Sequence, residues 1–343
     1  MNIFFTSVWL RRAGKVVFIL SLFAGAVASA ASLRTQTINL HRGWNAVCLQ
    51  VDPTNSRPAD CFTGTPVSIV AAYVGAATSV QYVQNPTTNN VNGDNGWSVW
   101  YASDRPDAFL TGLFNLNANN AYLIYSRSDY VWSLTGAAVL NVVKWKPNSF
   151  NLAGFCLDSL SPPTFDQFFA ASAAHRPYRI YRLVNDQWVL VDHAQTTQMR
   201  SGEAYWTYCA GSSDYQGPLD VKIQNSQNVL VNGINQAGVL LANKTGNPLS
   251  VRVENSASSA VLPLAYVLRV VSDSNVVSAA FDLPDTYNMP AFDAKESRGF
   301  WLTLRPEKMA TASETTLLKI TTDIGTQCWL PVTGNRSELY QAN

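Results

Sequence analysis

Few histidines are available for acid–base catalysis, because the 343 residues of this chain include only three: His41, His175 and His193. A Ser-His-Asp site would need Asp192 to orient His193, but adjacent residues on a strand point to opposite faces. We therefore interpret His193 as a solvated loop residue. The G-x-S-x-G, H-E-x-x-H, Walker and dinucleotide-binding motifs are also missing from the sequence. The sequence accordingly predicts a protein that is not an enzyme and that has no catalytic residue and no cofactor.

Glycoside hydrolysis needs only two carboxylic acids, and three lie beside landmarks of the sequence: Asp158, Glu203 and Asp214. Asp158 has a counterpart in Asp52, and Asp214 has one in Asp129. An Asp that is retained before Pro or within a Ser-Asp-Tyr turn usually serves that turn. We favour this structural role, and a glycan hydrolase is kept as a distant alternative.

Aromatic residues are abundant, with 10 Trp, 14 Tyr and 15 Phe. Exposed rings beside Asn and Asp suit sugars, whose C–H faces stack on aromatic side chains. The candidate ligand-binding residues are Trp97, Trp100, Trp188, Tyr205 and Trp206. Tyr205 and Trp206 should point to opposite faces of a strand, so a sheet with one wet face cannot bury both. The alternative is that Trp206 packs against a neighbouring module.

The five cysteines are an odd number for an oxidising compartment. The simplest assignment is one disulfide in each half of a repeat, Cys48–Cys61 and Cys156–Cys209, with Cys328 left over. Buried free thiols are the alternative, because an unpaired Cys packs as a small hydrophobic residue. We expect no metal site, since the chain has no C-x-x-C pair and few histidines.

An internal repeat indicates how the strands that carry these groups are organised along the chain. The segment Trp44–Asp52 returns as Phe150–Asp158, and Asn45 and Asn151 differ in number by 106 (151 − 45). Ala121–Tyr125 is then echoed by Ala204–Tyr208 at an offset of 83 (204 − 121). Because these signals recur in the same order, they indicate a tandem duplication. The change of offset indicates a shorter second copy.

Each predicted unit is rich in strands. A first β-rich module is expected over residues 32–138 and a second over 139–223. In the second, Thr164 and Gln167 form a capping box that predicts a helix over Thr164–Ala174. Asn185-Asp186 should be the tight turn of a hairpin between Tyr178–Val184 and Gln187–Val191.

A third unit is expected over residues 224–336, followed by a frayed tail at 337–343. About seven short β-prone runs separated by turn signals are typical of an immunoglobulin-like sandwich. The fold class is therefore mainly β, with two tandem related modules and a sandwich. The seven runs are Val229–Val231, Gly238–Ala242, Leu249–Glu254, Ala265–Val271, Gly299–Leu304, Thr316–Thr321 and Gln327–Val332.

Residues 1–30 are typical of a signal peptide, with a basic start, the uncharged apolar run Val16–Val27 and the cleavage pattern Ala28-Ser29-Ala30. The alternative, an uncleaved anchor, normally needs about 20 apolar residues. Charged residues make up only 14% of the chain and the formal net charge is +1. Without a basic cluster, nucleic acid is not an expected partner. We expect export to the periplasm or cell surface, with no membrane span after cleavage.

The repeated motif resembles that of a group of exported bacterial proteins of uncharacterised function, which carry Gly-Trp-Asn-type β-rich modules. The resemblance covers both copies of the repeat and implies an extracytoplasmic β-rich module with no catalytic residue. In the first copy it rests on Gly43, Trp44, Asn45, Val47, Asp52 and Pro53. In the second copy it rests on Ser149, Phe150, Asn151, Asp158, Gly202, Glu203, Ala204 and Tyr205.

Together these patterns predict a non-enzymatic structural, adhesive or interaction protein of the bacterial cell envelope or exterior. Its partners would be other envelope or extracellular proteins, or glycans. A carbohydrate-binding protein is the main alternative, and the sequence leaves the oligomeric state open.

Overall fold

The computed structural model describes residues 32–74, 83, 85–88, 91, 96–224, 228–256, 262–272 and 275–336. The predicted signal peptide at 1–30 and the predicted tail at 337–343 lie outside these residues. Only part of the polar loop at 85–96 is described. The fold is mainly β, as predicted, and its strands form five sheets.

The first unit pairs a three-stranded sheet with a four-stranded sheet. The three-stranded sheet has the order β1-β7-β3, and the four-stranded sheet has the order β2-β6-β4-β5. Alternate residues of the two sheets meet in one core, which contains Ile38, Val47, Val70, Tyr122 and Trp132. The elements are β1 (Leu33–Leu40), β2 (Gly43–Cys48), β3 (Val51–Pro53), α1 (Pro58–Cys61), β4 (Val67–Tyr73), η1 (Pro86–Thr88), β5 (Trp97–Tyr101), η2 (Ala108–Leu110), β6 (Ala121–Ser126) and β7 (Tyr130–Ala138).

The second unit has one four-stranded sheet of order β10-β9-β11-β8. Its capping box forms as predicted: the Gln167 backbone N–H donates to Thr164 Oγ1 at 3.2 Å, and the Thr164 N–H donates to Gln167 Oε1 at 2.8 Å. The helix ends at Phe169, earlier than predicted, and packs three buried phenylalanines on the sheet. The elements are β8 (Ser149–Gly154), α2 (Phe165–Phe169), η3 (Ala173–His175), β9 (Ile180–Val184), β10 (Gln187–Leu190) and β11 (Ala204–Cys209).

The hairpin between β9 and β10 also follows its prediction. Asn185 and Asp186 have φ angles of 49° and 63°. Positive φ at both central residues is the requirement of a type I′ turn, whose twist matches that of the flanking strands.

The third unit is an immunoglobulin-like sandwich of two five-stranded sheets, β12-β14-β19-β16-β17 and β13-β21-β20-β15-β18. The pairing is antiparallel except between β13 and β21. The seven predicted strands are all present, and β12, β17 and β18 are additional. The strands are β12 (Leu219–Ile223), β13 (Val229–Asn232), β14 (Ala237–Asn243), β15 (Val251–Asn255), β16 (Leu264–Ser272), β17 (Asn275–Asp282), β18 (Thr286–Asn288), β19 (Ser297–Leu304), β20 (Ser313–Thr322) and β21 (Gln327–Asn335), with η4 (Pro306–Lys308) after β19.

β12 lies within the range predicted for the second module, yet it pairs with β14 of the sandwich. The structure therefore places residues 219–223 in the third unit, a difference from the predicted boundary. The sequence signal failed here because a single short strand carries no mark of the sheet it will join.

The repeated segments occupy equivalent places in the two four-stranded sheets. Gly43 pairs with Ser126 across β2 and β6, and Ser149 pairs with Cys209 across β8 and β11. Adding the two repeat offsets to the numbers of the first pair gives the second pair (43 + 106 and 126 + 83). The two edge strands therefore share one register.

Single side chains repeat their roles as well. Tyr122 accepts a hydrogen bond through its hydroxyl from the Asn117 N–H at 2.8 Å, and Tyr205 accepts one from the Arg200 N–H at 2.7 Å. Asn45 and Asn151 each bind two backbone groups of the turn that precedes their strand. These residues fix the same local geometry twice.

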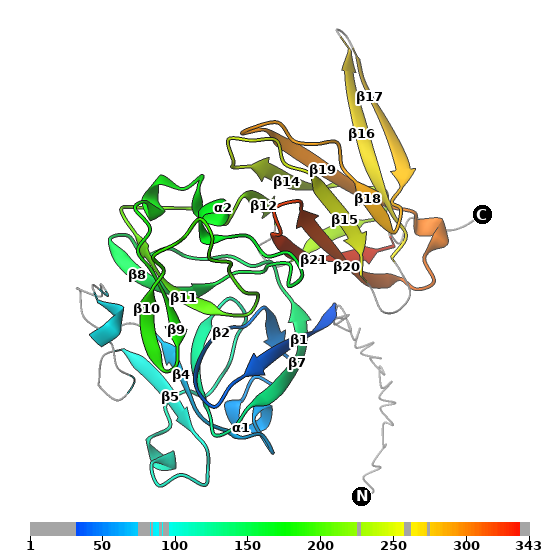
Figure 1. Cartoon of the computed structure of the whole chain (residues 1–343). Helices are drawn as coiled ribbons and strands as arrows, with labels where there is room; N and C mark the ends of the chain where they lie inside the picture. Colours follow the sequence, from blue (N-terminus) through cyan, green and yellow to red (C-terminus); the bar gives the residue numbers. More distant parts are fainter. Residues whose placement is uncertain are drawn as a thin grey trace, which may run out of the picture.

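The first two units adjoin the sandwich (Figure 1), and hydrogen bonds join them to it. The Asp158 N–H donates to Gly325 O at 2.9 Å, and the Gln327 N–H donates to Cys156 O at 3.2 Å. From the first unit, Ser32 Oγ donates to Thr316 O at 2.9 Å. All three units therefore contribute to one junction.

Gly154 is the tightest point between the first two units. A Cβ at this position would lie 2.2 Å from Cys48 Cβ and 2.6 Å from Glu203 O. Gly154→Ala should therefore lower the free energy of unfolding by about 3 kcal/mol, since overpacking at a rigid contact forces the backbone apart. Urea denaturation measures this change. Gly246→Ala is the control, because nothing lies within 4 Å of its Cβ position; equal stability of the two variants would contradict the predicted clash.

Candidate functional site

Trp206 of the predicted aromatic platform is buried between the two four-stranded sheets. Trp206 is 0% exposed. Its ring lies 5.4 Å from that of Tyr73, 6.4 Å from that of Trp97 and 6.1 Å from that of Trp188, with edge-on geometry in each case. Edge-to-face aromatic contacts of this kind stabilise a packed interface. Trp206 thus packs against the neighbouring unit, which was the alternative to a ligand platform.

The other platform residues divide between this interface and the cores. Trp97 and Trp188 occupy equivalent positions, since Trp97 pairs with Tyr73 across β5 and β4, and Trp188 pairs with Leu183 across β10 and β9. Both are half-buried at the interface. Trp100 lies in the core of the first unit, and Tyr205 lies in the core of the second.

The expectation that Tyr205 and Trp206 cannot both be buried is wrong. Both are 0% exposed. The sheet of the second unit has no wet face along β11: α2 covers the side of Tyr205, and the first unit covers the side of Trp206. Trp100, Tyr205 and Trp206 are therefore buried, whereas Trp97 and Trp188 are half-buried.

Polar contacts lock the same interface at its rim. The Cys48 N–H donates to Gly202 O at 2.9 Å, and Val47 forms an antiparallel bridge with Glu203. The hairpin tip residue Asp186 accepts a hydrogen bond from the Trp44 N–H at 2.6 Å. One edge of β2 is therefore covered by the second unit.

Glu203 is a structural carboxylate. It pairs with Arg182 at 2.9 Å, and both side chains are only 16% exposed. The Tyr205 hydroxyl donates to Glu203 Oε2 at 3.0 Å. Burial, and then the nearby Glu203 charge, hold the pKa of Tyr205 well above its ordinary value.

The remaining predicted carboxylates lie in turns. Asp52 accepts a hydrogen bond from the Ala118 N–H at 2.7 Å, and Asp129 accepts one from the Arg42 N–H at 2.8 Å. Asp158 accepts one from the Leu160 N–H at 3.0 Å. Asp214 is exposed. These contacts are those expected of turn residues.

All five cysteines are free thiols, so the predicted Cys156–Cys209 and Cys48–Cys61 disulfides are absent. The register explains the first: Cys209 lies opposite Ser149, which precedes Cys156 by seven positions (156 − 149), or about 20 Å along an extended chain. A disulfide requires Cα atoms within about 7 Å. Cys48 faces the interface and Cys61 packs on the opposite side of the sheet, against the first core.

Burial keeps these thiols protonated. It raises the pKa of Cys48 to about 12 and that of Cys61 to about 11. Thiols with such values are poor nucleophiles at neutral pH.

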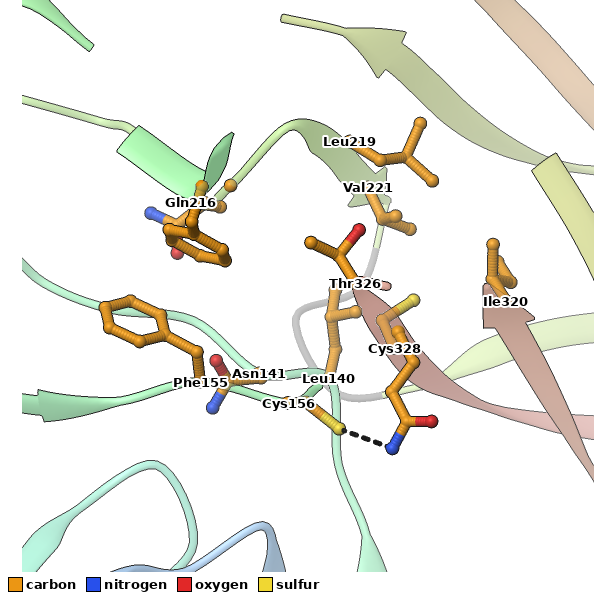
Figure 2. Close-up of a pocket in the computed structure, with 13 residues that line it drawn as sticks. Leu140, Asn141, Phe155, Cys156, Gln216, Leu219, Val221, Ile320, Thr326 and Cys328 are labelled. Atoms are coloured by element: carbon orange, nitrogen blue, oxygen red, sulfur yellow. Dashed lines mark hydrogen bonds between the residues drawn. The ribbon is translucent and has the colours of Figure 1, made fainter. Parts of the chain in front are cut away.

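Cys156 lines a small cavity between the second unit and the sandwich. The Gln327 side-chain amide donates to Cys156 Sγ at 3.6 Å, and a dashed line at Cys156 marks this contact in Figure 2. The cavity has a volume of about 40 Å³. This volume holds about one water molecule, so the cavity belongs to the packing of the junction and is too small for a ligand.

A larger cleft of about 640 Å³ opens between the first unit and β8. One wall is the loop before β6, which carries four asparagines. The other wall is β8 together with the segment that joins the first two units, which adds Lys144 and Lys146. The polar residues that line the cleft are Asp52, Tyr73, Asn115, Asn117, Asn119, Asn120, Tyr122, Lys144, Lys146 and Asn151.

The sequence prediction missed this cleft. The cluster of asparagines from Asn115 to Asn120 was its only local signal, and such a cluster is also typical of an ordinary loop.

An exposed apolar face lies on the hairpin of β16 and β17, which extends away from the rest of the sandwich (Figure 1). Near its base, the Phe281 ring stacks on Tyr266 at 5.6 Å, and Tyr266 stacks on Tyr287 of the facing sheet at 4.4 Å. Phe281 is 47% exposed there, and farther out, where the facing sheet ends, Leu268 is 46% exposed and Val277 is 62% exposed. This face continues the sandwich core without a covering layer.

Within the described part of the chain, no three His, Cys, Asp or Glu side chains are grouped closely enough to hold a metal ion. Among the same residues, no helix has the length and apolar character needed to cross a membrane.

No protein-family model matches the chain, and no curated protein matches it. Solved structures show a remote likeness. The YadV chaperone is 13% identical over 37% of this chain and 55% of its own, with a TM-score of 0.25. The PapD-like domain 7 of human CEP192 is 10% identical over 37% of this chain and 87% of its own, with a TM-score of 0.23.

A bacterial surface protein gives a longer but equally remote match. The MSCRAMM ACE of Enterococcus faecalis, which binds its ligands by the collagen Hug model, is 7% identical over 90% of this chain and 84% of its own, with a TM-score of 0.20. The chain spans about half the length of the YadV chaperone. At these identities the likeness concerns the β-sandwich fold alone.

His175 provides a test of the second core. It is buried beside Trp145, with ring centroids 4.2 Å apart, and its Nδ1 lies 2.6 Å from Ser172 Oγ. Burial lowers the pKa of His175 from 6.5 to about 4. The unfolded chain therefore binds the proton more tightly, so stability is fully present above pH 6.5 and falls as the pH drops toward about 4.

The decrease between these two pH values should reach about 3 kcal/mol, measured by urea denaturation across the range. His175→Phe should remove this part of the pH dependence, whereas His193→Gln, at an exposed loop position, should retain it. An unchanged pH profile in His175→Phe would show that other groups cause the decrease.

Proposed function

We propose that this protein is an exported, non-enzymatic interaction protein of the bacterial cell envelope or exterior, with a structural or adhesive role. The observation that carries the proposal is the uncovered apolar face of the β16–β17 hairpin. Exposed contiguous apolar surface on a folded protein usually marks a site of contact with another macromolecule. The signal-like pattern of residues 1–30 and the low charge content support an extracytoplasmic setting.

Hydrogen bonds and ion pairs hold the base of the hairpin against the segment that follows β19. Arg305 donates to Ala280 O at 2.9 Å and to Asp282 Oδ1 at 2.7 Å. Lys308 adds a second contact to Asp282. Positive side chains at an edge strand discourage indiscriminate strand addition, so the apolar face farther out is the surface left for a partner.

The proposal is tested by replacing Val277 and Phe281 together with Ser. Both side chains are largely exposed, so the fold should be retained, but binding to isolated cell-envelope fractions should fall at least about fivefold, because apolar anchors dominate such contacts. Binding is measured by co-sedimentation of the purified mature protein.

Val131→Ser is the matched control, because Val131 is 60% exposed on the three-stranded sheet of the first unit. Equal binding by the hairpin variant and this control, in a protein that is monomeric by light scattering, would contradict the proposed role of the hairpin.

A further inference from the structure

The large cleft beside β8 lies at the repeat counterpart of a contact between the first two units. That contact forms on the other side of the interface, and the described residues at the counterpart positions do not form it. On the closed side, Val47 bridges to Glu203 and the Cys48 N–H donates to Gly202 O. The first repeat offset converts Val47 and Cys48 into Ala153 and Gly154 (47 + 106 and 48 + 106).

By the second offset, the counterparts of Gly202 and Glu203 are Asn119 and Asn120 (202 − 83 and 203 − 83). All four counterpart residues line the cleft, on its two opposite walls: Ala153, Gly154, Asn119 and Asn120. The cleft therefore separates the two surfaces that touch on the other side of the interface.

The strand β8 forms one wall through its edge, since all of Phe150–Gly154 lines the cleft. β11 pairs with the other edge of β8. The Phe150 N–H points outward and donates to Val83 O at 2.9 Å. Because peptide groups along a strand alternate in direction, the Leu152 peptide groups also point outward, into the cleft.

The equivalent edge of β2 shows which groups satisfy such a strand. There the outward N–H groups of Trp44 and Cys48 bind a carboxylate, that of Asp186, and a main-chain carbonyl, that of Gly202. An extended peptide with acidic side chains offers both kinds of acceptor.

The charges of the cleft favour the same ligand. Lys144 and Lys146 are exposed side chains that line it, and neither forms an ion pair with another described residue. Asp52 is the one acidic residue among the described lining residues, and its Oδ1 is held by the Ala118 N–H.

We infer that this cleft binds an extended, acidic peptide segment of a partner protein, whose main chain pairs with the outward peptide groups of Leu152 as residues 202–203 contact β2. The acidic side chains face Lys144 and Lys146, and residues 119–120 lie on the opposite wall of the cleft. Strand addition of this type derives affinity from main-chain hydrogen bonds and specificity from alternate side chains. The inference goes beyond the proposed function, because it uses a surface separate from the β16–β17 hairpin.

The test uses the full mature chain and a fluorescein-labelled, end-blocked hexapeptide of alternating Asp and Val, with binding followed by fluorescence anisotropy. The Asp-Val peptide should bind, and rising salt should weaken it. A Lys-Val hexapeptide should bind at least about tenfold more weakly, because its lysines are repelled by Lys144 and Lys146. An Asp-Val peptide with alternate N-methylated amides should also bind at least about tenfold more weakly, because it has lost main-chain hydrogen-bond donors.

Two variants locate the site. Lys144→Glu with Lys146→Glu should lower the affinity for the Asp-Val peptide at least about tenfold, and both positions are exposed, so folding should be unaffected. Lys244→Glu with Lys295→Glu, in the sandwich, is the matched control and should bind as the wild type does. The hairpin double variant should also retain peptide binding, which separates this inference from the proposed function.

Hydrogen exchange at single amides gives an independent readout. In the free protein the Leu152 amide should exchange rapidly and become protected on addition of the Asp-Val peptide, while the Cys48 amide stays protected throughout. Slow exchange at Leu152 in the free protein would overturn the inference, because the chain itself would then cover the edge.

The inference also fails if the Asp-Val peptide does not bind, or if the N-methylated peptide binds equally well. Binding of hexagalacturonate without binding of the peptide would overturn it as well and assign the cleft to an acidic glycan instead.

Discussion

Face-to-face packing of two four-stranded sheets around Trp206 determines how the first two units are arranged. It places Gly154 against Cys48, closes the edge of β2 with Gly202 and Asp186, and buries Trp97 and Trp188 at equivalent positions. Complementary sheet faces with interdigitating side chains behave as a core, and such a core resists sliding. The two units therefore act as one body, and the cleft beside β8 is a fixed feature of its surface.

Packing of this kind explains why the strands and turns could be predicted from the sequence, whereas the segments that pack against the sheets could not. The capping box of Thr164 and Gln167 and the turn at Asn185-Asp186 each report a local geometry, and each is found in the structure. The repeat offsets even anticipate the register of β8 against β11. Local chemistry of this sort is written in neighbouring residues.

The aromatic residues show the limit. An alternating strand such as Ala204–Cys209 is compatible with one wet face or with none, because the pattern does not identify what covers the sheet. The sequence around Trp206 therefore suits a platform as well as an interface, and only the tertiary structure separates the two. The cysteines fail for a related reason, since sequence spacing does not report that Cys156 and Cys209 lie near opposite ends of a strand pair.

The five buried or half-buried thiols bear on how the chain reaches its native state. No covalent crosslink joins its three units, so cohesion rests on apolar packing and on main-chain contacts at the junction. Acquisition of this fold needs neither a thiol oxidase nor a disulfide isomerase. Its stability should consequently be indifferent to reducing agents and to the oxygen supply of the surrounding medium.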